Sequence, residues 1–443
     1  MSASANENTS GLRLILRAMS HRNYRLFFGG QSISLVGTWM QQIALNWLVY
    51  RITGSAMLLG IVGFTSNIPV IFVAPFAGIL ADRWNRHKMV IIIQILATVQ
   101  AAILAALVLA NMITVWEIIV LGIMLGLINS FDIPVRQAFI VDMIERREDL
   151  GNAIALNSSM FNGARLIGPS VAGVLIAAVG EGYCFLLNAI SYIPVVIALM
   201  AMRVRPQARH VHRPQVMSDL KEGFKYAFGF PPIISILMLL ALISLVGMPY
   251  SLLMPIFAKN ILHGDSQTMG FLVGASGIGA LIGAIYLASR KSVRGLGKII
   301  PISAAIFGVG LVAFSFSRLM SLSLFLMVVT GFGMITQMAS SNTVLQTIVD
   351  EDKRGRVMSF YTMSLRGMAP FGNLMAGGMA ASVGAPNTLL IGGLCCVLGA
   401  LLFAKGLPNF RRLIRPIYME KGIVPSVANG LQTAAEMTTP PKE

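Results

Sequence analysis

Two arginines inside long apolar stretches have the clearest chemical potential in this sequence. Arg165 stands four positions before Pro169, and Arg366 stands four positions before Pro370. A guanidinium stays protonated and forms paired hydrogen bonds to carboxylates or phosphates through its planar set of N–H donors. A charge at membrane depth is costly, so it usually has a function there. Both arginines are therefore candidates for contacting an anionic substrate, such as a catecholate or a carboxylate.

Two structural roles compete with substrate contact for these arginines. Each side chain can extend to the nearer membrane surface, keeping its stem in apolar surroundings. Each can also donate to backbone carbonyls that the following proline leaves without an N–H partner. Assaying anionic against neutral substrates in the paired alanine variants separates these roles.

Acidic side chains are almost absent from the apolar stretches. Of the 18 acidic residues, only Asp132 lies well inside one, and Arg136 follows at the i,i+4 spacing that allows an ion pair on a helix. We interpret this pair first as part of a lock between helices. Asp132 is also the one candidate for proton coupling, because the first apolar stretch offers only polar side chains that do not titrate.

Membrane-spanning helices must position these residues. The chain has 443 residues, 56% hydrophobic and only 12% charged, against roughly a quarter charged in soluble proteins. Apolar runs of about 20 residues predict helices that cross a bilayer, where the backbone must satisfy its own polar groups. We predict an all-α membrane protein with twelve transmembrane helices, at residues 24–50, 57–80, 89–110, 115–138, 153–179, 184–202, 231–257, 269–289, 298–316, 320–347, 357–382 and 388–405.

The predicted helices divide into two similar halves. The Arg–Pro pairs of the fifth and eleventh spans are both displaced by 201 positions (366 − 165 and 370 − 169). This register predicts two six-helix bundles related by a pseudo-two-fold axis. The predicted organisation is an N-terminal tail at 1–23, bundles at 24–202 and 231–407, a linker at 203–230 with an amphipathic helix at about 217–228, and a partly disordered tail at 408–443.

The net charge of +16 lies mainly on one side of the predicted membrane. Of the 34 lysines and arginines, 28 fall in the tails, the linker and the even-numbered connections or at the span ends that border them, whereas Arg51, Lys259 and Arg318 fall on the other side. This positive-inside pattern predicts a multi-pass protein of the bacterial cytoplasmic (inner) membrane with both termini in the cytoplasm. It argues against nucleic acid as the partner of the positive charge.

The sequence lacks the motifs of enzymes, metal sites and nucleotide sites. The three cysteines and five histidines lack the spacing of a metal site. No phosphate-binding loop for ATP and no hydrolytic triad is present. We therefore predict no enzyme activity, no metal and no cofactor.

The connection after the second span carries a recognisable motif. Residues 78–88 read Gly-Ile-Leu-Ala-Asp-Arg-Trp-Asn-Arg-His-Lys, which resembles the loop signature of the major facilitator superfamily, with Asn85 in place of a glycine. In that family the loop aspartate caps the start of the eleventh helix and holds the cytoplasmic side closed. The resemblance implies a gating lock that includes the Asp132 pair; its residues are Gly78, Asp82, Arg83, Arg86, Asp132 and Arg136.

Further stretches resemble one branch of that superfamily. Residues 132–138, 352–357 and 168–173 are similar to those of the enterobactin exporters and macrolide efflux proteins, a drug:proton antiporter branch, although Ala172 replaces a glycine of the export signature. The resemblance implies a secondary transporter that exports amphiphilic drugs or siderophore-like metabolites by alternating access, and it leaves proton coupling open. The alternatives are a lipid or lysophospholipid translocator and a non-transporting membrane sensor.

A substrate cavity between the halves would be lined by polar side chains of the spans. Each of these polar residues could equally hold helices together. The predicted partners are a small-molecule substrate and membrane lipid, and the chain is predicted to be a monomer. The cavity candidates are Gln42, Asn46, Asn162, Arg165, Arg366 and Asn373.

Overall fold

Helices make up all the regular structure in the part of the chain that the computed structural model describes, residues 16–204, 224–290, 292–351, 353–421 and 423. The short helices η1 (Arg17–Ser20) and η2 (Arg147–Asp149) precede long ones. The long helices of the first half are α2 (Arg22–Thr53), α3 (Ala56–Arg83), α4 (Arg86–Leu109), α5 (Val115–Met143), α6 (Leu150–Val179) and α7 (Glu181–Met200).

The second half contains two helical rods that are not regular α-helices throughout. The first consists of α9 (Pro231–Leu242), the π-helical turn η3 (Ile243–Gly247), α10 (Tyr250–Ile256) and the π-helical turn η4 (Phe257–Ile261). The other consists of α14 (Arg354–Thr362), the π-helical turn η5 (Met363–Gly367) and α15 (Ala369–Val383). The remaining helices are α11 (Ser266–Ala288), α12 (Leu296–Phe316), α13 (Met320–Ile348) and α16 (Ala385–Glu420).

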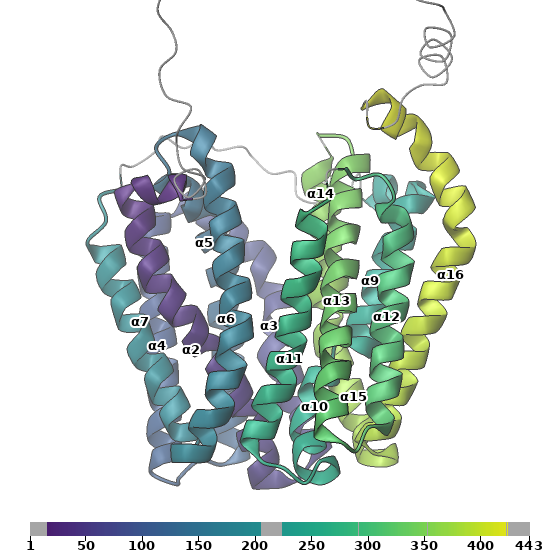
Figure 1. Ribbon diagram of the computed structural model, residues 1–443. Coiled ribbons are helices and arrows are strands. Elements are labelled where there is room, and N and C mark those ends of the chain that lie inside the picture. The colour runs from purple at the N-terminus through teal and green to yellow at the C-terminus, as the bar shows by residue number, and fades with distance from the viewer. Residues whose placement is uncertain (1–15, 205–223, 291, 352, 422, 424–443) are drawn as a thin grey trace, which may run out of the picture.

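Ten of the described helical segments are long and apolar enough to cross a membrane. The predicted all-α membrane fold is therefore confirmed. The first and eleventh predicted spans, α2 and the α14–α15 rod, are not among these ten, although they run alongside the others (Figure 1). The count of twelve stays a prediction.

Both described chain ends lie at the same end of the bundle, which we call the terminal face (Figure 1). The other end, where α2 turns into α3 and α6 turns into α7, is called the opposite face. The turn after α2 follows from its sequence: Gly54 adopts a φ of 60°, and the Ser55 side chain accepts the N–H of Leu58 to cap α3.

The two halves meet through two helix pairs, α6 with α11 and α3 with α15. Glycines make the contact close. A Cβ on Gly173 would lie 2.8 Å from the Cα of Gly270, and a Cβ on Gly377 would lie 2.6 Å from the Cα of Gly60. Small residues let helix backbones approach in this way. All four glycines lie toward the opposite face.

The last helix is longer than predicted. α16 continues past residue 407, through Pro408 to Glu420. The predicted boundary between bundle and tail at 407/408 stays a prediction. Phe410, Ile414 and Tyr418 recur every four residues and are buried, which gives this extension an apolar stripe after the span itself ends. The predicted tails lie outside the described residues at 1–15 and 424–443. The amphipathic helix predicted at 217–228 also lies largely outside them, and residues 224–229 are helical.

Candidate functional site

Arg165 links the two halves at mid-height of α6. Its guanidinium carbon lies 5.8 Å from the centre of the Trp39 ring, and its Nη2 donates to the sulfur of Met334 in α13 at 3.8 Å. Trp39 in turn meets Phe161 edge-to-face at 5.7 Å. Arg165 thus stacks on one half and touches the other. Neither of these contacts is with a backbone carbonyl freed by Pro169.

Arg366 sits on the π-helical turn η5. Such turns often occur at functional sites, because they break the regular hydrogen bonding of a helix. The Leu365 carbonyl next to it accepts the Ser244 hydroxyl of η3. The exposed side chain of Arg366 is therefore not needed to satisfy that carbonyl.

The two arginines occupy equivalent positions in the sequences of the two halves, but their backbone conformations differ. α6 runs as continuous α-helix through Arg165 with Pro169 inside it. The matching rod of the second half becomes π-helical at Arg366, just before Pro370. The pseudo-symmetry that the Arg–Pro pairs indicate in sequence is thus broken locally.

Positive charge predominates between the halves at this depth. Among the residues that the structure describes, neither Arg165 nor Arg366 forms an ion pair with an acid. An anionic group placed between the halves would be attracted to these cations.

Asp132 and Arg136 form the ion pair that their spacing predicts. Arg136 Nη2 lies 2.9 Å from Asp132 Oδ2, and the two side chains are only 14% and 17% exposed. Gln94 of α4 donates to Asp132 Oδ1 at 3.3 Å. Sequence reasoning did not single out Gln94. The one signal for it in the sequence is its polar side chain within the apolar run 89–110.

The loop motif lies where α3 ends and α4 begins. The side chains of Asp82 and Arg83 and the surroundings of Gly78 lie outside what the structure describes, so their predicted lock stays a prediction. Arg86 Nη1 lies 3.5 Å from Asp142 Oδ1 and links the start of α4 to the end of α5. Sequence reasoning missed Asp142 because it ended the fourth span at residue 138, whereas α5 continues to Met143.

The other predicted cavity residues differ in their contacts and exposure. Asn373 spans the interface, since its Nδ2 donates to the Gly63 carbonyl at 3.4 Å. Asn162 donates within its own helix to the Ser158 carbonyl at 2.9 Å. On α2, the side chain of Gln42 is exposed and that of Asn46 is half-buried. Their role in a substrate cavity stays a prediction.

Further contacts close the opposite face. The Asn260 amide donates to the Tyr50 hydroxyl at 2.6 Å, and the Ser266 hydroxyl donates to the Gly173 carbonyl at 3.2 Å. Together with the close approach of Gly173 to Gly270 and of Gly377 to Gly60, these hydrogen bonds hold the two halves together at this face. The structure is therefore a conformation closed at the opposite face.

This closure yields a prediction for Gly173. Gly173→Val should push α6 away from α11, because no side chain fits against Gly270. We expect a wider distance between spin labels at Met112 and Leu319, which are exposed at the opposite face on different halves, and roughly tenfold slower transport, about 1.4 kcal/mol in barrier. Gly163→Val is the control on the same helix, since nothing lies within 4 Å of its added Cβ. Unchanged label distances in Gly173→Val would contradict the prediction.

Two helical halves that touch toward one end, with cations between them at mid-height, define a membrane transporter of the alternating-access class. The chain belongs to the family described as transmembrane secretion effector, which it matches over residues 16–414. That family lies within the major facilitator superfamily, in its drug and siderophore efflux branch, as the loop motif and the branch stretches predict.

Named relatives and solved structures agree with this assignment. A staphyloferrin A transporter of Staphylococcus aureus is 26% identical over 385 residues, which cover 86% of this chain and 95% of the relative. The multidrug efflux pump Tap of Mycolicibacterium fortuitum is 25% identical, over 84% of this chain and 92% of the pump. The crystal structure of a bacterial homologue of the lysosomal transporter Spinster, inward-facing and unoccupied, shares the fold with a TM-score of 0.71 at 12% identity, covering 88% of this chain and 98% of that one.

Proposed function

We propose that this protein exports an anionic amphiphilic small molecule, a drug or siderophore-like metabolite, across the bacterial cytoplasmic membrane. The observation that carries the proposal is the pair Arg165 and Arg366, one in each half and neither paired with an acid among the described residues. A guanidinium without a protein carboxylate at membrane depth gains most from an anionic ligand.

The surroundings of Arg165 favour an amphiphile over a small inorganic anion. Trp39 and Phe161 present aromatic surface beside the guanidinium, and Met334 faces it from the other half. Methionine adapts its shape to varied apolar ligands. The relatives named as a staphyloferrin A transporter and a multidrug efflux pump support such a substrate.

In this proposal the terminal face is cytoplasmic. The support is the concentration of 28 of the 34 lysines and arginines in segments that belong to that side. A structure closed at the opposite face is then closed on the side away from the cytoplasm. One chain supplies both arginines, so we propose that the monomer is the transporting unit.

The proposal also includes proton coupling, for which one acidic residue of the spans could carry the proton. Asp132 is the acid at mid-depth of the first half, and it contacts Arg136 and Gln94. If protons drive export, Asp132 carries them. Its first role in the proposal is to neutralise Arg136.

Substrate charge gives the direct test. Proteoliposomes with the purified chain are loaded with a fluorescent amphiphile that bears one carboxylate, or with its methyl ester. We expect the carboxylate to be transported at least about tenfold faster, the effect of one charge-assisted hydrogen bond of roughly 1.5 kcal/mol. Equal rates for the two compounds would contradict the anion preference. Movement of a labelled phospholipid between leaflets, with neither compound transported, would favour a lipid translocator instead.

A further inference from the structure

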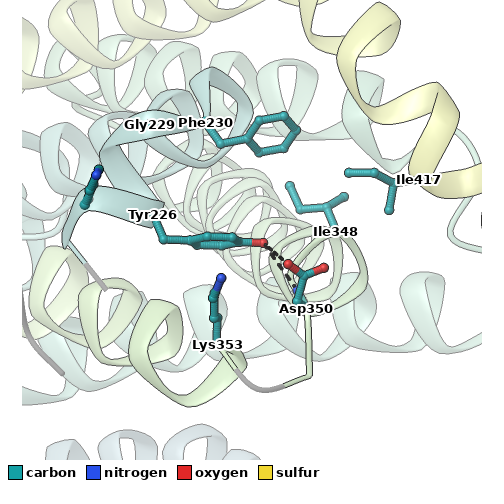
Figure 2. Close-up of a pocket in the computed structure, with 8 residues that line it drawn as sticks. Tyr226, Gly229, Phe230, Ile348, Asp350, Lys353 and Ile417 are labelled. Carbon is teal, nitrogen blue, oxygen red and sulfur yellow. Dashed lines mark hydrogen bonds between the residues drawn. The ribbon is translucent and has the colours of Figure 1, made fainter. Parts of the chain in front are cut away.

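A pocket of about 520 Å³ opens at the terminal face of the second half, away from the arginines described above. It lies where the residues before α9, the connection from α13 to α14, and the extension of α16 come together (Figure 2). Its lining residues are Lys225, Tyr226, Gly229, Phe230, Ile348, Asp350, Lys353 and Ile417.

Tyr226 organises the polar side of this pocket. Its hydroxyl donates to Asp350 Oδ2 at 3.1 Å, and its ring lies 4.9 Å from the Lys353 ammonium (Figure 2). Among the described residues, neither Lys353 nor the exposed Lys225 forms an ion pair. Among the described lining residues, two ammonium groups therefore border the pocket against one carboxylate that already accepts a hydrogen bond.

The other side of the pocket is apolar. Phe230, Ile348 and Ile417 face the cavity there (Figure 2). α9 begins at Pro231 and α13 ends at Ile348, and both belong to segments able to cross a membrane. The pocket thus lies at the level where the spans end and lipid headgroups begin.

Basic and aromatic residues surround the pocket at this level. The α16 extension buries its apolar stripe and exposes Arg411, Arg412 and Arg415. Phe224 and Phe228 belong to the segment that supplies Lys225 and Tyr226; their rings stack at 4.1 Å and remain 53% and 44% exposed. A basic amphipathic surface with exposed aromatic rings is typical of contact with an anionic membrane surface.

We propose that this pocket binds the headgroup of an anionic phospholipid. The phosphate lies between the ammonium groups of Lys225 and Lys353, and the glycerol and first methylenes of the acyl chains pack on Phe230 and Ile417. Apolar and cationic groups on opposite walls match the two parts of such a lipid, whereas a soluble phosphate would use only the cationic wall. The leaflet is the cytoplasmic one if the orientation proposed above holds; binding to the pocket itself does not depend on that orientation.

Native mass spectrometry of the purified full chain, titrated with phosphatidylglycerol or phosphatidylcholine, tests the pocket. We expect phosphatidylglycerol to be retained and phosphatidylcholine to be lost. Lys225→Gln with Lys353→Gln should weaken phosphatidylglycerol binding roughly thirtyfold, about fivefold for each lysine. The matched control is Lys298→Gln with Lys405→Gln, which removes the same charge from two exposed lysines outside the pocket. An equal loss in the control would show diffuse attraction and overturn the site.

A second arm separates lipid from soluble phosphate. Glycerol 3-phosphate should not displace phosphatidylglycerol, and Ile417→Asn should weaken the lipid by removing part of the apolar wall. Full displacement by glycerol 3-phosphate, with no effect of Ile417→Asn, would make the pocket a soluble-anion site and overturn the assignment to lipid. These binding readouts need no transport activity, so their failure is distinct from failure of the proposed export.

Discussion

Replacing both Arg165 and Arg366 with alanine is expected to lower transport of the carboxylate-bearing amphiphile by roughly 100-fold or more. A hydrogen bond to a charged group contributes about 1.5–3 kcal/mol, so losing one should lower the transport rate roughly tenfold to 100-fold for each arginine. Transport of the methyl ester should fall less than about threefold, since a neutral ligand gains little from a guanidinium. The measurement is the initial rate for each compound in proteoliposomes with equal protein content.

Two further variants separate charge from position. Arg165→Lys keeps the charge but loses the planar group that lies over Trp39, so we expect an intermediate loss for the carboxylate. Arg318→Ala removes an arginine that, among the described residues, donates to the carbonyls of Ser315 and Ser317 near the opposite face, so both rates should stay unchanged. Parallel losses of carboxylate and ester transport in the double alanine variant would assign the arginines a structural role.

Asp132→Asn is expected to slow transport by roughly tenfold to 100-fold at every pH. The change keeps the shape of the side chain but leaves the mostly buried Arg136 without its counter-ion, and breaking such a pair costs about 3–5 kcal/mol where it is fully buried. Arg366 adds a second positive charge on the facing half. Closing the terminal face brings the two halves together, so an uncompensated Arg136 should oppose that step.

The double variant Asp132→Asn with Arg136→Gln decides what Asp132 does. If the carboxylate serves to neutralise Arg136, removing both charges should restore most of the transport rate. The assay compares downhill exchange with transport driven by an imposed pH gradient. Restored exchange with no response to the gradient would assign the proton to Asp132, whereas loss of both activities would contradict the charge-balance role.

The gating lock shows why a motif is easier to find than a site. Residues 78–88 indicate the superfamily because their types and order are unusual beside a membrane span. The ion pair of Arg86 with Asp142 joins residues 56 positions apart, and no local pattern links them. The Asp132–Arg136 pair could be predicted because both residues lie on one helix, where spacing determines proximity.

Inter-half contacts escape sequence reasoning for a similar reason. Tyr50 and Asn260 lie 210 positions apart, and nothing near either residue indicates the other. The glycines at 173 and 270 are ordinary for membrane helices, where such residues are frequent. Only the packing of α6 on α11 shows that these two must stay small.

The sequence by itself determined the membrane fold, the two-half register and the presence of arginines without acidic neighbours along the chain. These follow from composition, period and charge, because the bilayer constrains local sequence so strongly. Tertiary structure alone decided that Arg165 stacks on Trp39 and contacts Met334, and that Arg366 lies in a π-helical turn. Helical spacing places a side chain on a face of its own helix, but its partner depends on how two halves dock, which is a property of the whole packed molecule.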